Sequence, residues 1–239
     1  MLNIIKYTIN SMVLLSASSI AGVSIDSTRI IFQDRNNKSG ESVGITSSST
    51  SLTPYLIKAQ VLKTPTGESE KTPFIVTPSL FRLEPGTTNK ILIIKDNMDL
   101  PKDKESVFYL RTIATPTSER NNISQQNNIG GSVKISSGNI IKLFYRPDGL
   151  KTTPHQAMKS LQFTIEGNGV KVLNPSPYYV TLNSLSIGGV KVPLSIKTGN
   201  TMIPPQSGNF YPNIIQKGKV EWEAINDYGG LEVFYDQIL

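Results

Sequence analysis

The stretch GNIIKLFYRPDG (138–149) joins a run of β-branched and aromatic residues to a turn signal. Such a run predicts a buried β-strand, and the Pro-Asp-Gly sequence after it predicts that the strand ends there. Lys142 nevertheless stands in the middle of the run. A charged ammonium that loses its water inside a sheet raises the free energy of the folded state, so an unpaired Lys142 would be costly at this position.

The sequence on both sides of this stretch has the same character. Runs of β-branched or aromatic residues recur about every ten residues between Pro, Gly or polar clusters, which is typical of a β-sandwich or barrel. We therefore predict an all-β fold with one short helix or turn over 154–163. The runs cover 23–32, 41–49, 55–62, 74–84, 89–95, 106–114 and 139–146, and then 161–168, 169–175, 178–192, 202–212, 218–227 and 231–239.

A domain boundary is predicted where turn signals crowd together. Pro147, the pair Asp148-Gly149 and Pro154 fall within one polar stretch. Strand runs lie on both sides of it, so we predict two β-sandwich domains joined by a short link. The first domain covers residues 22–147 and the second covers 148–239.

The composition excludes several classes of function. The chain has 239 residues, no cysteine and one histidine, so a disulfide framework, a thiol nucleophile, a zinc site and a Ser-His-Asp triad are not expected. The formal charge is +6, but the basic residues are scattered and match no nucleic-acid-binding motif. We predict a protein that is not an enzyme, needs no metal or cofactor, and binds no nucleic acid.

The N-terminal segment predicts export. Lys6 precedes a short apolar run, and the sequence Ser19-Ile20-Ala21 fits a signal-peptidase site. The run is shorter than the roughly 20 apolar residues that span a bilayer. Residues 1–21 are therefore predicted to be a cleaved signal peptide, with a buried first strand or helix as the alternative. No later segment is apolar enough to insert into a membrane.

A polar loop precedes the strand that carries Lys142. Residues 116–132 are rich in Asn, Gln and Ser, and we expect a loop between two strands. Val133 and Ile135 follow it and share one face of the strand. An apolar row in this position suits an edge that offers side chains and backbone hydrogen bonds to another chain. A kink or bulge at Gly138 would change the side of the sheet on which the side chains of the later residues lie.

Arg29 stands in a second apolar run, STRIIF (27–32). An arginine fork and a lysine point charge together suit a carboxylate, such as that of a chain terminus. Spacing alone does not bring Arg29 and Lys142 together. The residues themselves therefore leave two interpretations open, an anion site or edge-strand charges that discourage aggregation.

Several segments, in order from about Gly22 to the C-terminus, resemble the periplasmic chaperones of chaperone–usher pili. Each segment is weak alone, but their combination in this order is specific. In the first domain they are DSTRIIF (26–32), TPYLIKAQV (53–61), PFIVTPSLFRLEPGTTNKILII (73–94), LPKDKESVFYLRTI (100–113) and IIKLFYRP (140–147). In the second they are NPSPYYVTL (174–182), MIPPQS (202–207) and AINDYGG (224–230).

The resemblance implies a fold and a set of roles. The fold would be two immunoglobulin-like sandwiches set in an L with a cleft between them, and Pro54 would follow a cis peptide bond. Arg29 and Lys142 would anchor the C-terminal carboxylate of a pilus subunit in the cleft. Alternating residues of one strand would fill the groove of a subunit that lacks a strand, and charged residues would fix the angle between the domains. The strand residues are Val133, Ile135 and Ser137, and the charged residues are Glu105, Arg146 and Asp227.

The implied partners are a pilus subunit, which the protein would fold and cap in the periplasm, and the outer-membrane usher that receives it. Two copies would also be able to pair through exposed strand edges before a subunit binds. The subgroup stays open, because the loop 116–132 is longer than the short type while the cysteine pair of the long type is absent. Ser137 and Asn139 interrupt the apolar row, so the number of subunit pockets that it fills is also open.

Other functions fit parts of the sequence. A secreted immunoglobulin-like adhesin would share the strand pattern, and so would a pilus subunit, although a subunit would have one incomplete sandwich. A carbohydrate-binding module would use FYP (210–212) and PYY (177–179) as a stacking platform. An exported enzyme would use the carboxylates of 95–105, but these are mixed with lysines as in a solvated loop.

Overall fold

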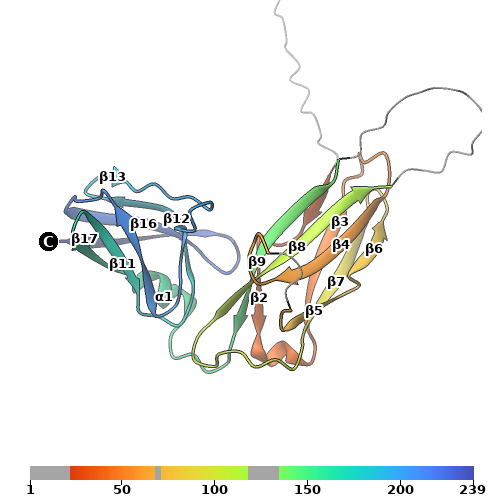
Figure 1. Ribbon diagram of the computed structural model, residues 1–239, viewed down its shortest axis with the longest axis horizontal. Helices are drawn as coiled ribbons and strands as arrows, with labels where there is room; N and C mark the ends of the chain where they lie inside the picture. The colour runs from red at the N-terminus through yellow and green to blue at the C-terminus, as the bar shows by residue number, and fades with distance from the viewer. Residues whose placement is uncertain (1–21, 68–70, 118–134) are drawn as a thin grey trace, which may run out of the picture.

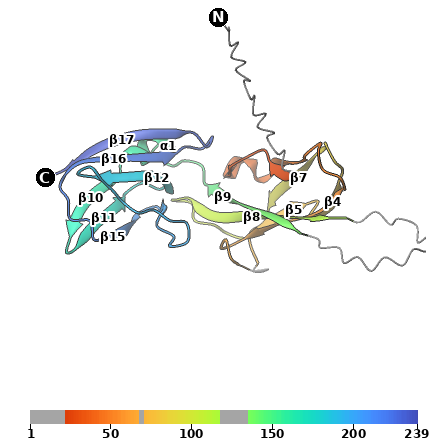
Figure 2. The ribbon, with the colours of Figure 1, turned by 90° about the horizontal axis from the view of Figure 1, so that it is seen from above.

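The computed structural model describes residues 22–67, 71–117 and 135–239. These residues form two β-sandwiches that stand at an angle to one another, like the arms of an L (Figure 1). The view from above shows the same two bodies, connected by the segment that follows strand β9 (Ser137–Arg146) (Figure 2). The all-β fold with two sandwich domains is therefore confirmed.

Some predictions concern residues that the structure does not describe. The predicted signal peptide (1–21), residues 118–132 of the predicted loop, and Val133 lie outside the described residues. Within the described ranges, no helix is both long enough and apolar enough to span a membrane.

The first sandwich packs a four-stranded sheet against a five-stranded sheet. The four-stranded sheet contains, in spatial order, β1 (Val23–Ile25), β3 (Glu41–Ser47), β7 (Thr88–Lys95) and β5 (Phe74–Thr77). The five-stranded sheet contains β2 (Arg29–Gln33), β9, β8 (Ser106–Pro116), β4 (Tyr55–Leu62) and β6 (Leu80–Leu83). A short 3-10 helix, η1 (Asp34–Asn37), follows β2.

Two of the predicted runs in the first sandwich each divide into two strands that lie in different sheets. The run 23–32 becomes β1 and β2, because residues 26–28 leave the ladder and Asp26 accepts a hydrogen bond from the Gly44 amide at 2.9 Å. The run 74–84 becomes β5 and β6, which are separated at Pro78, a residue without an N–H for a ladder. The chain thus crosses from one layer of the sandwich to the other at both places.

The prediction of a cis peptide bond before Pro54 was wrong. Among the described residues, the cis bond precedes Pro78. Both prolines follow a threonine, so the local sequence does not distinguish them. In an ordered structure, the tertiary surroundings lock an X-Pro bond in one isomer.

The second sandwich begins with helix α1 (Pro154–Lys159), which is shorter than the predicted 154–163. Thr153 and Gln156 start the helix as a capping box, in which each side chain accepts a hydrogen bond from the backbone N–H of the other. The helix ends at Lys159 with Ser160 as its C-cap, and the residues from Gln162 onward form a strand.

Two sheets follow α1. One contains β10 (Gln162–Glu166), β11 (Gly169–Asn174) and β15 (Ser207–Pro212). The other contains β13 (Val190–Lys191), β12 (Val180–Ile187), β16 (Gly218–Ile225) and β17 (Leu231–Ile238), and β14 (Met202–Ile203) also pairs with β12. Because β9 ends at Arg146 and α1 begins at Pro154, the boundary proposed at 147/148 falls in the connecting segment.

Each sandwich encloses its own apolar core. The core of the second sandwich is built around Trp222, the one tryptophan of the chain, which is 1% exposed. Its ring lies 4.9 Å from that of Phe163 and 5.7 Å from that of Phe234, and its indole N–H donates to the Met158 carbonyl at 3.1 Å. Helix α1 is thereby tied to the sheet that contains β16.

Truncation of Leu185 is expected to destabilise the second sandwich. Leu185 is 2% exposed and lies opposite Trp222 in the β12–β16 ladder, so Leu185→Ala leaves a cavity beside the indole ring. We expect the free energy of unfolding to fall by about 2–5 kcal/mol. Urea unfolding followed by the fluorescence of Trp222 measures this change.

Val190→Ala is the control for this experiment. Val190 is 40% exposed in the same sheet, so its truncation should change the free energy of unfolding by less than about 0.5 kcal/mol. Equal losses in the two variants would contradict the assignment of Leu185 to the core.

Candidate functional site

Strand β9 divides into two halves with different neighbours. Residues 142–146 pair in parallel with β2 on one side, and residues 142–145 pair with β8 on the other. Residues 137–141 pair with β8 alone among the described strands. The outer edge of 137–141 therefore has backbone groups that are available to another chain.

The register of β8 and β9 is continuous, so the kink or bulge considered at Gly138 is absent. Strict alternation holds along the strand, with Leu143 in the core and Lys142 on the opposite face. Ser137 is the first residue of β9. Ile135 lies just before the strand and is 77% exposed.

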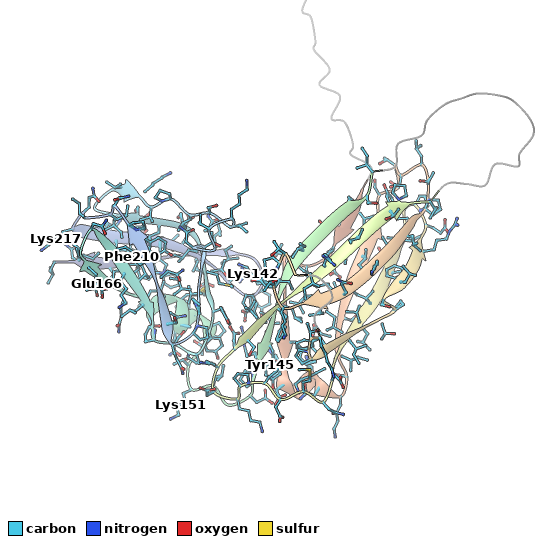
Figure 3. The ribbon with its side chains drawn as sticks, viewed as in Figure 1. Lys142, Tyr145, Lys151, Glu166, Phe210 and Lys217 are labelled. Atoms are coloured by element: carbon cyan, nitrogen blue, oxygen red, sulfur yellow. The ribbon has the colours of Figure 1, made fainter. Side chains whose placement is uncertain are left out.

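The parallel pairing of β2 with β9 brings Arg29 and Lys142 together. The two residues are register partners, so their side chains project from the same face of the sheet. This face is turned toward the second sandwich, because Arg29 Nη1 donates to the Ile225 carbonyl at 2.8 Å and Lys142 Nζ donates to Thr181 Oγ1 at 3.4 Å. Figure 3 shows Lys142 between the two sandwiches. Both cations therefore lie in the cleft, and we call them the Arg29–Lys142 site.

Both cations of this site are partly desolvated. Burial, and secondly the charge of Arg29, lower the pKa of Lys142 to about 8. Burial also lowers the pKa of Arg29, against the opposing effect of the Asp227 and Glu105 carboxylates. Arg29 Nε is buried without a hydrogen-bond partner among the described residues. An anion at this place would offset the repulsion between the cations and accept that hydrogen bond, so the site is suited to an anion.

Arg146 links the two sandwiches through two carboxylates. Its Nε donates to Glu105 Oε1 at 2.7 Å, and its Nη1 and Nη2 donate to the two oxygens of Asp227 at 2.7 and 2.9 Å. Glu105 is 4% exposed, and its other oxygen accepts from the Tyr179 amide at 2.9 Å. Burial raises the pKa of Glu105, while the charge of Arg146 and the Tyr179 amide oppose that shift. The structure thus brings the three charged residues together at the junction of the sandwiches.

The sequence did not predict that two aromatic residues, Tyr178 and Tyr179, lie at the junction of the sandwiches. The Tyr178 ring lies 5.0 Å from the Arg146 guanidinium carbon, and the Tyr179 ring packs on that of Phe144 with their centres 5.8 Å apart. Phe210 lies in the second sandwich away from the cleft (Figure 3), so the PYY and FYP segments do not form a common stacking platform. The one signal for their position was that Tyr178 and Tyr179 open the predicted strand run 178–192.

Thr181 and Ile225, which contact the two cations, were also missed. Their residue types carry no signal for such a contact, since Thr181 offers a hydroxyl and Ile225 only a backbone carbonyl. The acidic stretch 95–105 contributes Glu105 to the junction. Among the described residues, no group of three or more His, Asp or Glu side chains could hold a metal ion.

Two family models match the chain. The model described as "Pili and flagellar-assembly chaperone, PapD N-terminal domain" matches residues 22–151. The model described as "Pili assembly chaperone PapD, C-terminal domain" matches residues 156–233. Together the two models cover both sandwiches.

Curated relatives and solved structures agree with these models. The chain is 34% identical over 229 residues to an uncharacterized fimbrial chaperone, YcbF, of Escherichia coli strain K12, and the match covers 92% of this chain and 89% of that protein. It is 34% identical over 228 residues to the chaperone protein PsaB of Yersinia pestis, with 87% and 81% covered.

Two solved structures have the same arrangement of both sandwiches. A chain from the complex of the Salmonella enterica SafA pilin with the SafB chaperone has a TM-score of 0.74 and 27% identity, with 93% of this chain and 99% of that chain covered. The E. coli chaperone DraB has a TM-score of 0.75 and 27% identity, with 92% and 97% covered.

Removal of the Arg146 side chain is expected to weaken the junction. Arg146→Ala leaves Glu105 as a buried carboxylate without its guanidinium partner. We expect the free energy of unfolding to fall by about 3–5 kcal/mol, because a buried charge loses its compensation. Urea unfolding followed by circular dichroism measures this change.

Arg82→Ala is the matched control. Arg82 and Glu84 form an ion pair at 2.6 Å, but their side chains are 59% and 53% exposed. The loss there should stay below about 1 kcal/mol. If both variants lose stability equally, the buried pair contributes no more than a surface pair.

Proposed function

The chain belongs to the family of chaperones that assemble pili by the chaperone–usher pathway, and on this premise we propose that it binds a pilus subunit through the cleft and through β9. One observation carries the proposal. Two partly desolvated cations, Arg29 and Lys142, lie side by side at the point where the open edge of β9 ends. Such a pair suits the carboxylate at the C-terminus of a bound chain.

The strands beside the site suggest how the subunit lies. β2 begins at Arg29 and occupies the position next to β9 from Lys142 onward. A subunit strand would take the same position beside residues 137–141. It would end at the start of β2, and would therefore run in the direction of β2 and parallel to β9. The carboxylate would then set the register, since a slip of one residue turns every side chain to the opposite face.

The strand segment before the site would in turn complete the subunit. A subunit that lacks one strand exposes an apolar groove and unpaired backbone groups, and alone it would aggregate. Val133, Ile135 and Ser137 would fill this groove by donor-strand complementation, a form of β-strand addition. The high exposure of Ile135 supports this role, because a donated side chain must be free to enter a partner.

We place this activity in the periplasm, after removal of residues 1–21, with delivery of the subunit to the outer-membrane usher. Glu105, Arg146 and Asp227 would hold the two arms of the cleft at the angle that the subunit requires. Before a subunit binds, the open edge of β9 would be available to a second copy of the chain.

Affinity purification of tagged protein from the periplasm of pilus-expressing host cells tests the proposal. The wild-type protein is expected to retain a β-rich subunit, which mass spectrometry identifies. Lys142→Ala should lower the amount retained by about tenfold or more, because a desolvated carboxylate loses one of its charge partners. Lys217→Ala is the control, since Lys217 lies at the end of the second sandwich away from the cleft (Figure 3). Equal retention by the two variants would rule out the Arg29–Lys142 site as the anchor.

The affinity for the subunit is expected to fall above pH 8. Lys142 has a pKa of about 8 in the free protein, and a bound carboxylate would raise this pKa, so binding favours the protonated amine. The affinity should change little between about pH 6 and about pH 7 and should then fall by up to about tenfold per pH unit as Lys142 loses its proton. Binding of the C-terminal peptide of the retained subunit, measured at several pH values, gives the slope.

Lys142→Arg is the control for the pH dependence. Arginine stays charged over the whole range, so the variant should bind with little change between about pH 7 and about pH 9. An unchanged slope in Lys142→Arg would show that another group titrates.

A further inference from the structure

The loop 193–200 of the second sandwich forms a wall of the cleft opposite Lys142. A pocket opens between this loop, the start of β12 and Lys142. The side chains that matter for its chemistry are those of Lys142, Thr181, Leu194, Ile196, Lys197 and Ile225. Lys142 thus belongs both to the Arg29–Lys142 site and to the pocket.

Hydrogen bonds hold the loop in a defined conformation. The Asn200 side chain donates to the Pro193 carbonyl at 2.9 Å and accepts from the Ser195 amide at 2.7 Å. The Asn200 carbonyl accepts from the hydroxyl of Tyr211, a core residue, at 2.8 Å. The loop nevertheless presents Ile196 with 85% of its surface exposed. An apolar side chain held out beside a binding cleft is a candidate for contact with the bound partner.

We propose, on the basis of the function proposed above, that this pocket receives a side chain from one of the last two residues of the bound subunit and selects a large apolar one. A strand that ends at Arg29 and Lys142 brings its last residues to the mouth of the pocket. Successive side chains of a strand point to opposite faces, so one of the last two faces the second sandwich and the loop.

The lining determines the chemistry of the selected side chain. Leu194, Ile196 and Ile225 offer apolar surface, and a large apolar side chain would remove part of this surface from water. Lys142 and Lys197 disfavour a lysine or arginine, since like charges repel more strongly where the surroundings are poor in water. The pocket therefore selects for an apolar residue and against a basic one.

A library of short synthetic peptides, randomised at the last two positions, is the probe for this selection. One half of the library has a free C-terminal carboxylate and the other half is amidated. Peptides retained by the full-length protein are sequenced by mass spectrometry. Among the free-carboxylate peptides, wild type should enrich large apolar residues over alanine by about tenfold at one of the two positions.

Matched variants test whether the preference for apolar residues arises in the pocket. Ile196→Ser should reduce the apolar enrichment several-fold, whereas Ile215→Ser should keep it, since Ile215 is 64% exposed in a loop outside the pocket. Lys197→Glu should admit basic residues at the selected position, whereas Lys217→Glu should not. Enrichment that is unchanged in both Ile196→Ser and Lys197→Glu overturns the inference.

The two halves of the library separate this inference from the proposed function. Retention of free-carboxylate peptides over amidated ones, without any preference between side chains, leaves the carboxylate site standing and rejects the pocket. Equal retention of both halves, or retention of neither, contradicts the carboxylate site itself and with it the proposed function.

Discussion

The parallel pairing of β2 with β9 is the constraint on which the candidate site depends. It sets Arg29 beside Lys142 and covers β9 only from that point onward. Both the cation pair and the open edge therefore follow from the place where β2 begins. That place is set by the crossing at residues 26–28, where the chain leaves the sheet of β1 and joins the sheet of β9. A single strand over 23–32 would have given neither feature.

The cations on this face of the first sandwich have different surroundings. Arg146 meets Glu105 and Asp227, so its charge is compensated and it joins the two sandwiches. Arg29 and Lys142 meet a backbone carbonyl and a hydroxyl, which are neutral acceptors. A compensated cation gains little from a further anion, whereas two neighbouring cations that form no direct ion pair with a carboxylate among the described residues gain more. This contrast distinguishes the Arg146 ion pairs, which connect the two sandwiches, from the Arg29–Lys142 site, which is suited to a ligand.

Much of the fold could be predicted from local patterns. Alternation and turn signals predicted the strands and the two sandwiches, and Thr153 and Gln156 start a helix where the sequence placed one. The crossings between sheets could not be predicted, since residues 26–28 and Pro78 look like ordinary interruptions of a strand. Thr53-Pro54 and Thr77-Pro78 have the same local chemistry, so the choice of the cis bond also escaped prediction. The strand that a segment pairs with determines where the chain crosses between sheets, and that pairing depends on residues distant in sequence.

The amino-acid order alone shows that Arg29 and Lys142 stand in apolar runs and that Glu105, Arg146 and Asp227 belong to segments typical of a pilus chaperone. Their residue types and their order along the chain carry that information. The folded chain is needed to show that Arg29 lies beside Lys142, that Thr181 and Ile225 accept their hydrogen bonds, and that Ile196 lies at the cleft. Arg29 and Ile225 are 196 residues apart in sequence, and a contact at that separation depends on how the two sandwiches pack, which no local pattern encodes.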